Sequence, residues 1–344
     1  MKRKIMRIIA VVLAVVLIFA GSFGGYVLYR FNRNTLKCDI NYEEVYSRNS
    51  ISLKAEDDGL FRVLKINDTH LFNGTSENDE RTLAAVKSIL DETPCDLIIA
   101  DGDIVDGFNL SSSYDKKNAI ESFAQLIESY NVPWTFVPGN NDGEIDSDND
   151  DIIAFLMQYR NFLCGNEKGI DGSMQFFIDI TYNSKTVHSI AVLDSGMRKP
   201  KAIGSYDYIK ENQIKWLLDG VNERQVKTSV FFHMPTPAFK TAYDKGTAYD
   251  GIDRFETYAY DDIEKNELFD NMTADNEYIS LLSCGHVHSN NMCSYYNGRY
   301  YQLSAVSGYN ASHDDFITPY CTLTVIDTLS NDVQNMYQFE QLTK

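Results

Sequence analysis

Residues 96–106 read DLIIADGDIVD, and the fold is best predicted outward from this stretch. An apolar run of strand length ends at Gly102, and the carboxylates of Asp103 and Asp106 follow it. Two other apolar runs also lead into polar residues, FRVLKIN at 61–67 and VPWTFVPG at 132–139. Helical patterns with one apolar stripe lie over 78–91, 115–130 and 150–162. Strands that alternate with helices of this length predict an α/β fold with a mainly parallel sheet.

The second half of the chain predicts more strands and one further helix, near 208–219. The strand candidates are 174–180, 187–195, 228–235, 278–288, 322–327 and 333–342. The last two are expected to close the chain as antiparallel strands. Asn297-Gly298 between two aromatic runs is typical of a two-residue hairpin turn. Residues 240–275 have only weak periodicity, so we interpret them as an inserted lid or substrate loop.

The N-terminal segment predicts a membrane anchor. Residues 1–7 carry four basic side chains, and no charge then occurs over the 22 residues from Ile8 to Tyr29, a length that spans a bilayer. These four basic residues outnumber the two just after the run, so we expect one span at about 8–29 with the N-terminus inside. The body of the protein is then extracytoplasmic. A signal cleaved near Ala20-Gly21-Ser22, which yields a secreted form, is the alternative.

The expected organisation is an anchor at 1–33, a stalk at 34–58 and one domain at 59–344. Hydrophobic residues make up 44% of the chain, enough for a large core. The anchor region holds six Lys/Arg, so the remainder carries 25 basic and 49 acidic residues, a net charge of −24. Such a body repels nucleic acid and attracts cations. The six cysteines contain no C-x-x-C pair, which argues against a zinc ribbon, and their spacing selects no disulfide pairing.

Residue types that bind metals recur where the predicted strands end. They are Asp68-Thr69-His70, Asp103 to Asp106, Gly139-Asn140, His233 and His286-Val287-His288. Loops at the carboxyl ends of strands in an open α/β sheet converge on one crevice. The paired residues in D-x-H and H-x-H fall on the same side of an extended backbone. The sequence therefore predicts a metal site built from segments far apart in the chain.

The order of these motifs resembles that of the calcineurin-like metallophosphoesterase superfamily, whose pattern is D-x-H, G-D-x-x-D, G-N-H-[DE], a lone His, and G-H-x-H. The resemblance covers about residues 60–315. LDSG at 193–196, YDYIKENQIKWL at 206–217 and FFHMPTP at 231–237 look like the purple acid phosphatase 29-like and Dcr2-like branch. The resemblance implies an α/β, calcineurin-like phosphoesterase fold, a four-layer sandwich of two facing mixed β-sheets flanked by helices.

The resemblance also implies two metal ions and the residues that hold them. The first ion is expected on Asp68, His70, Asp103 and His288. The second is expected on Asp103, Asn140, His233 and His286, with Asp103 bridging. Histidine and oxygen ligands suit Mn, Fe or Zn, and the sequence leaves the choice open. Two such ions activate a bridging water for attack on a phosphate mono- or diester. The net charge favours a small phosphate-ester substrate over a long polyanion.

Asn141 departs from the family pattern, which usually has histidine there. Asparagine donates a hydrogen bond but cannot deliver a proton at neutral pH. The residues expected to take part in catalysis are Asp103, Asn141 and Asp142. Asp142 and Glu144 are candidates for a substitute acid. Two hypotheses follow: a hydrolase with an altered proton donor, or an impaired metal- and phosphate-binding sensor or scaffold. Two further histidines, His188 and His313, match no family position. The sequence does not predict the oligomeric state.

Overall fold

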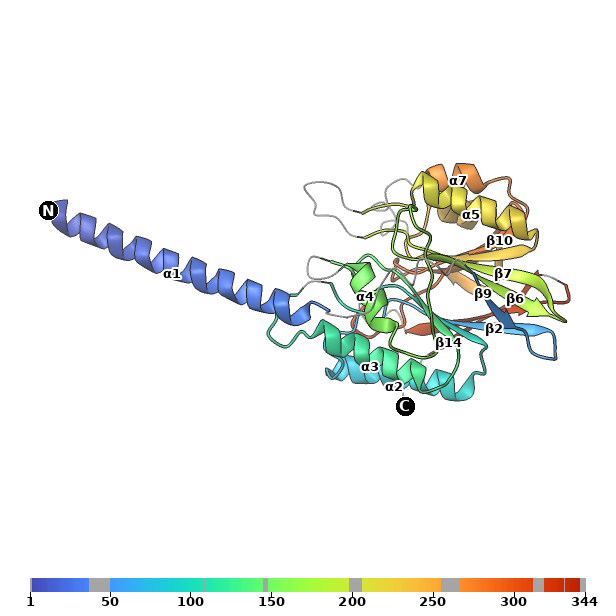
Figure 1. Ribbon diagram of the computed structural model, residues 1–344, viewed down its shortest axis with the longest axis horizontal. Helices are drawn as coiled ribbons and strands as arrows, with labels where there is room; N and C mark the ends of the chain where they lie inside the picture. Colours follow the sequence, from blue (N-terminus) through green and yellow to red (C-terminus); the bar gives the residue numbers. More distant parts are fainter. Residues whose placement is uncertain are drawn as a thin grey trace.

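The computed structural model has a long N-terminal helix and a body made of two β-sheets with helices on their outer faces (Figure 1). The structure describes residues 2–36, 50–107, 109–144, 148–197, 206–254, 267–311, 319–330 and 332–340. It describes the backbone but not the side chains at 2–15, 250–254 and 332–340.

The first sheet has six strands in the order β14-β13-β2-β3-β4-β5. Their bounds are β2 (Leu60–Ile66), β3 (Leu97–Asp101), β4 (Trp134–Val137), β5 (Phe162–Leu163), β13 (Tyr320–Asp327) and β14 (Asp332–Glu340). Strands β2 to β5 are parallel, whereas β13 pairs with β2 and β14 in antiparallel fashion. The helices that connect the parallel strands are α2 (Glu77–Glu92), α3 (Lys116–Glu128) and α4 (Asn149–Leu156). The parallel strands and closing antiparallel pair are thus as predicted.

The second sheet has eight strands in the order β1-β6-β7-β8-β10-β12-β11-β9. Their bounds are β1 (Ser50–Lys54), β6 (Gln175–Tyr182), β7 (Lys185–Leu193), β8 (Lys227–Phe231), β9 (Thr247–Arg254), β10 (Ile279–Cys284), β11 (Asn291–Tyr296) and β12 (Arg299–Leu303). Strands β7, β8, β10 and β12 are parallel neighbours. The helices of this half are α5 (Glu211–Arg224), α6 (Pro237–Lys245) and α7 (Glu267–Thr273). Asn297 and Gly298 both have positive φ, which confirms the predicted hairpin turn.

Two apolar clusters hold these layers together. The larger contains buried residues of both sheets, such as Leu64 and Ile178, together with residues of α2 and α3, such as Val86 and Phe123. The smaller joins the eight-stranded sheet to α5, α6 and α7. α2 and α3 lie on one outer side of the body and α5 and α7 on the other (Figure 1). The predicted α/β sandwich of two facing mixed sheets is therefore confirmed.

Two segments differ from the predicted organisation. Part of the expected stalk at 34–58 forms β1, which pairs in parallel with β6 along its whole length. The stretch 240–275 contains α6, the edge strand β9 and α7, so much of it belongs to the fold itself. Its residues 255–266 lie outside the described part of the chain. Weak periodicity misled the prediction because an edge strand and two short helices each show too few repeats of a pattern.

The helix α1 (Lys2–Asn34) is fixed to the body at its C-terminal end (Figure 1). Tyr26 donates through its hydroxyl to Leu110 O at 2.6 Å, and the fully buried Arg30 donates to the carbonyl oxygen of Tyr114. Arg33 forms an ion pair with Asp115. Within the part of the chain that the structure describes, no helix has both the length and the apolar character that a bilayer crossing requires.

Candidate metal centre

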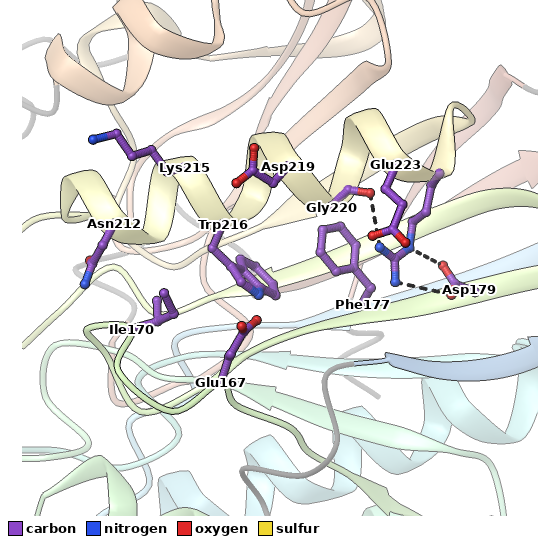
Figure 2. Close-up of a pocket in the computed structure, with 11 residues that line it drawn as sticks. Glu167, Ile170, Phe177, Asp179, Asn212, Lys215, Trp216, Asp219, Gly220 and Glu223 are labelled. Atoms are coloured by element: carbon purple, nitrogen blue, oxygen red, sulfur yellow. Dashed lines mark hydrogen bonds and ion pairs between the residues drawn. The ribbon is translucent and has the colours of Figure 1, made fainter.

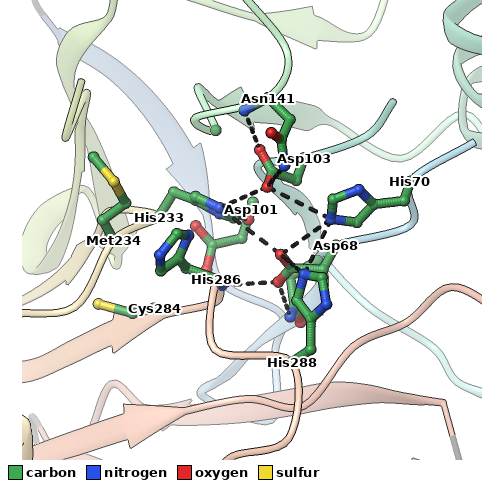
Figure 3. Close-up of polar contacts among 12 residues, drawn as sticks. Asp68, His70, Asp101, Asp103, Asn141, His233, Met234, Cys284, His286 and His288 are labelled. Atoms are coloured by element: carbon green, nitrogen blue, oxygen red, sulfur yellow. Dashed lines mark hydrogen bonds and ion pairs between the residues drawn. The ribbon is translucent and has the colours of Figure 1, made fainter. Parts of the chain in front are cut away.

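The predicted metal ligands follow the ends of five strands. Asp68 and His70 come after β2, Asp103 after β3 and Asn140 after β4, all in the six-stranded sheet; His233 follows β8, and His286 and His288 follow β10, in the eight-stranded sheet. Both sheets point these strand ends to the same edge, where the side chains meet (Figure 3). In that view His233 and His286 enter from one side and His70 from the other.

The backbone of the ligand loops is left-handed at four of these residues. Asp68, His70, Asp103 and His286 have φ of 51°, 44°, 50° and 69°. Such torsions cost about 1 kcal/mol or more for a residue with a side chain and cluster at functional sites. The D-x-H pair therefore converges through left-handed backbone, and the extended backbone on which the same-side geometry depended is not present there. His70 N donates to Asp103 O at 3.0 Å, which links this loop to the loop after β3.

The first cluster consists of Asp68, His70 and His288. His288 Nε2 lies 3.4 Å from Asp68 Oδ1 and 3.1 Å from His70 Nε2. His70 Nε2 lies 3.8 Å from the same carboxylate oxygen. One ligand atom from each residue falls within 4.8 Å of the others, close enough to bind a single ion.

The second cluster consists of Asp103, His233 and His286, whose ligand atoms also lie within 4.8 Å of one another. The Nδ1 of His233 lies 2.8 Å from the carbonyl oxygen of Asp101. A carbonyl only accepts, so this contact puts the proton of a neutral ring on Nδ1 and leaves the Nε2 lone pair for a ligand. Nε2 faces Asp103 Oδ2 at 3.3 Å.

Three polar atoms at the site test whether metal ions fit. Asp68 Oδ1, Asn140 Oδ1 and His233 Nε2 are buried and have no hydrogen-bond partner in the described part of the chain. Leaving a buried polar atom unpaired costs about 1–3 kcal/mol. All three have lone pairs that can coordinate a cation, and together with the two clusters they form a nitrogen and oxygen donor set typical of first-row metals. The residues therefore fit two metal ions.

Carboxylates favour positive charge at two of the histidine ligands, His70 and His233, whereas burial and the nearby His233 lower the pKa of His286 to about 3. Burial disfavours protonation of His70, but the carboxylates of Asp106, Asp68 and Asp103 outweigh it and raise the pKa to about 10. Burial likewise opposes protonation of His233, yet Asp103 and Asp68 raise its pKa to about 10. The carboxylates thus stabilise positive charge in a buried site. Metal ions provide this charge when they bind and displace protons from their ligands.

Asn141 and Asp142 both contact Asp103 through hydrogen bonds. Asn141 donates from its backbone N to Asp103 Oδ1 and from Nδ2 to Oδ2, each at 2.8 Å. The buried Asp142 accepts from the backbone N of Asp103 at 2.7 Å and of Gly139 at 2.9 Å through Oδ2. Its Oδ1 accepts from Val105 N at 3.3 Å. Both oxygens of Asp142 therefore accept from backbone N–H groups and connect two loops. Burial and the nearby Asp103 raise the pKa of this carboxyl to about 6, so its role as a substitute acid stays a prediction.

The other candidates from the sequence have varied positions. His188 is buried and pairs with Ser229 Oγ at 3.0 Å, away from both clusters, and His313 lies outside the described residues. The carboxylate of Glu144 lies close to Gly107, where an added Cβ would meet it at 2.6 Å. The five described cysteines are free thiols, and Cys38 lies outside the described part of the chain.

Sequence reasoning did not assign roles to several residues that border the centre. Asp106 lies 3.8 Å from His70 Nδ1 through its half-exposed carboxylate. Tyr206 packs its ring edge-on against His286, with centroids 5.1 Å apart. Lys65 and Asp101 form a fully buried ion pair of 3.4 Å behind the ligands. Burial lowers the pKa of Lys65 and raises that of Asp101 to about 6, with each charge opposing the shift of the other. The sequence feature that could have identified this pair is Lys65, a charged residue within the apolar strand candidate 61–67.

A cavity of about 800 Å³ lies elsewhere, between α5 and β6 (Figure 2). Its wall includes Trp216 and Phe177, and the guanidinium of Arg224 at its edge pairs with Asp179 at 2.7 Å. None of the predicted metal ligands lines it. The chemistry of the strand-end clusters is therefore separate from this cavity.

The fold and the two candidate metal clusters together are those of the calcineurin-like phosphoesterases. The family model described as calcineurin-like phosphoesterase matches residues 61–290, and the chain belongs to this family. It is 25% identical over 319 residues to probable inactive purple acid phosphatase 28 of Arabidopsis thaliana, covering 80% of this chain and 78% of that protein. It is 26% identical over 271 residues to phosphatase DCR2 of Saccharomyces cerevisiae, covering 70% of this chain but only 46% of the yeast protein.

A solved structure supports the architecture. A dimetal phosphatase from Danio rerio superposes with a TM-score of 0.50 at 12% identity, covering 82% of this chain and 99% of that one. A likeness at this identity shows the fold alone. The predicted relationship to purple acid phosphatase-like and Dcr2-like proteins is confirmed by the two sequence matches.

Proposed function

We propose that this protein is a dinuclear metal-dependent phosphoesterase that hydrolyses phosphate mono- or diesters. The observation that carries the proposal is the position of Asp103 Oδ2, which lies 3.3 Å from His233 Nε2 and 3.5 Å from His70 Nε2. One carboxylate oxygen thereby faces a nitrogen ligand from each cluster. A ligand that bridges two ions, as in two-metal phosphatases, needs this arrangement.

Each ion is assigned four protein ligands in this proposal. The first is held by Asp68, His70, Asp103 and His288, and the second by Asp103, Asn140, His233 and His286. Mn, Fe and Zn all suit this mixture of imidazole and oxygen donors. When bound, the ions supply Lewis-acid stabilisation of the phosphate oxygens and lower the pKa of a bound water that attacks in line.

The chain itself contributes orientation. Asn141 fixes both oxygens of Asp103, and the carbonyl of Asp101 fixes the ring of His233. His286 donates its backbone N to Asp68 Oδ2 at 2.9 Å, which links the loop after β10 to the loop after β2. Partners of this kind hold metal ligands in place, and their loss typically lowers metal affinity about 10–100-fold.

Asn141 does not supply a proton donor to the site. Asparagine cannot release a proton at neutral pH, and Asp142 uses both oxygens within the loops. General acid catalysis is typically worth about 10²–10⁴-fold. We therefore propose that the enzyme favours esters whose leaving group needs little protonation.

The substrate class and the cellular location are proposed from the sequence. A net charge of −24 outside the N-terminal region disfavours long polyanions and nucleic acid, so a small phosphate ester is the proposed substrate. The basic residues that flank the uncharged segment 8–29 are the support for a membrane-anchored form with the catalytic domain outside the cytoplasm, since no described helix has the apolar character of a bilayer span.

The second candidate function is a metal- and phosphate-binding sensor or scaffold without turnover. Two observations favour it. Asn141 occupies the position of the usual catalytic histidine and bonds to Asp103, and the Arabidopsis relative is named as probable inactive. A binder of this kind needs the same metals, so metal content alone does not separate the two functions.

Hydrolysis of p-nitrophenyl phosphate and bis-p-nitrophenyl phosphate by the full chain tests the proposal. The protein would be loaded with Mn, Fe or Zn, and bound metal would be quantified beside turnover. The variants are Asp103→Ala and Asn141→His, with Asp219→Ala as a matched control because Asp219 is an exposed carboxylate that lines the separate cavity.

Metal-dependent turnover that is lost in Asp103→Ala and kept in Asp219→Ala would support the enzyme. Two bound ions without turnover, together with activity in Asn141→His, would support the binder. A wild-type chain that binds no metal would refute both.

A further inference from the structure

Lys65 is a fully buried cation that contacts three acceptors next to the metal ligands. It lies on β2, three residues before Asp68. Its Nζ donates to Ser283 Oγ at 2.8 Å and to Cys284 O at 2.7 Å, and it lies 3.4 Å from Asp101 Oδ2. The ammonium group therefore makes two hydrogen bonds and one ion pair, all with buried partners.

Each of these contacts leads directly to a ligand loop. Cys284 ends β10 and precedes Gly285 and His286, whereas Asp101 ends β3 and precedes Gly102 and Asp103. The carbonyl of Asp101 also accepts from His233 (Figure 3). One ammonium therefore joins β2 and β3 of the six-stranded sheet to β10 of the eight-stranded sheet.

The polar contacts continue across the interface between the sheets. Ser283 donates to Gln302 Oε1 at 2.6 Å, and Gln302 Nε2 donates to Thr324 Oγ1 at 3.4 Å on β13. Well-packed apolar residues are often as stabilising as a buried ion pair in such a place. Stability alone therefore does not account for a lysine in the middle of an apolar interface.

The distance between the sheets matters because each cluster takes ligands from both. Asp68 and His70 of the first cluster come from the six-stranded sheet, and His288 comes from the eight-stranded one. In the second cluster Asp103 comes from the former and His233 from the latter. Metal sites tolerate misplacement of only about 0.5 Å. A shift of one sheet against the other would disturb both clusters at once.

We propose that Lys65 is a positioning residue that fixes the spacing of the two sheets at the metal centre. The inference rests on the proposed dinuclear function. Lys65 acts through Cys284 and Asp101 on the loops that carry His286 and Asp103, and it touches neither metal nor substrate.

Binding of Mn²⁺ to the full chain tests this role without using turnover. The main variant is Lys65→Met/Asp101→Asn, which removes both charges and leaves no unpaired carboxylate. Lys65→Gln/Asp101→Asn restores N–H donors without charge. Arg299→Met is the matched control, because Arg299 is also a buried cation that donates to backbone carbonyls, at Thr273 and Asn276, far from the ligand loops. Calorimetry gives the affinity, and electron paramagnetic resonance reports whether two bound Mn²⁺ ions are spin-coupled.

We expect the Met/Asn protein to bind Mn²⁺ about 10–100-fold more weakly and to lose the spin-coupled signal, with partial recovery in the Gln/Asn protein. Arg299→Met should lower the melting temperature but leave Mn²⁺ affinity and coupling unchanged. Unchanged affinity and coupling in the Met/Asn protein would overturn the inference, as would a Gln/Asn protein that binds no better than Met/Asn.

A milder variant covers the case in which Met/Asn does not fold. Ser283→Ala removes one of the three acceptors of Lys65 and the link to Gln302. We expect a several-fold loss of Mn²⁺ affinity, and an unchanged affinity would overturn the inference. A wild-type chain that binds no Mn²⁺ would overturn the proposed function and this inference together, whereas normal binding by both wild type and variants would overturn the inference alone.

Discussion

Asn141 holds Asp103 through two hydrogen bonds of 2.8 Å, one from its backbone N to Oδ1 and one from Nδ2 to Oδ2 (Figure 3). The second of these oxygens also faces His233 and His70. The residue that stands in the usual place of the family's histidine therefore orients the proposed bridging carboxylate. This contact gives residue 141 a structural role, although asparagine cannot act as a general acid.

The first prediction concerns Asn141→His. The imidazole can protonate the leaving oxygen, so kcat for esters with poor leaving groups, such as alkyl phosphates, should rise about 10²-fold. Turnover of p-nitrophenyl phosphate should change much less. The measurement is the dependence of kcat on leaving-group pKa, which should flatten in the variant. Asn141→Ala is the control, and an equal slope in all three proteins would show that the position does not govern proton transfer.

Asp142→Asn distinguishes a structural role of Asp142 from a role as general acid. Three backbone N–H groups, from Asp103, Gly139 and Val105, lose a charged acceptor in this variant. Hydrogen bonds to charged groups are worth about 1.5–3 kcal/mol each, so the melting temperature and the metal content should fall together. Thermal unfolding and metal analysis of the purified proteins check this. Normal stability and metal content with lost turnover would instead indicate an acid.

The pH dependence of stability should reflect Asp270, which lies on α7. Its carboxylate accepts from Thr236 Oγ1 and from Ala238 N, and burial raises its pKa to about 6. A raised carboxyl pKa means that the folded state holds the proton more tightly than the unfolded state. This contribution is fully present below pH 4 and is lost as pH rises through 6.

Asp270→Asn should remove that contribution. The difference in unfolding free energy between wild type and variant should change by on the order of 2 kcal/mol between pH 4 and pH 7. Urea unfolding at a series of pH values measures it. Lys240→Ala is the control, because it removes an exposed ion pair with Asp244, and such pairs contribute little to stability. A difference that does not vary with pH would contradict the prediction.

The last prediction concerns the end of α1. Arg30 is fully buried and donates to the carbonyls of Tyr114 and Ser112, so Arg30→Met leaves acceptors unpaired at about 1–3 kcal/mol. Amide hydrogen exchange over residues 109–115 should accelerate. Arg33→Ala breaks a partly exposed ion pair and should change exchange little. Equal exchange in both variants would show that Arg30 does not hold this loop.

The sequence by itself determined which residue types stand at the strand ends. Asp68-Thr69-His70 and His286-Val287-His288 are local patterns that follow apolar runs, and the alternation of strands and helices brings such ends to one edge. The two-sheet architecture and the paired clusters followed from these patterns together with the family resemblance. The hairpin turn at Asn297-Gly298 was also predicted from a local pattern, because its torsions depend on those two residues.

Only the tertiary structure decided how those residues are oriented. The left-handed backbone at Asp68 and Asp103, the inward direction of Asp142 and the bond from Asn141 to Asp103 arise where separate loops contact each other. Lys65 contacts Ser283 and Cys284 only because β10 of the other sheet lies against β2. Sequence patterns describe neighbours along the chain, whereas these contacts depend on how the two sheets pack against each other through the larger apolar cluster.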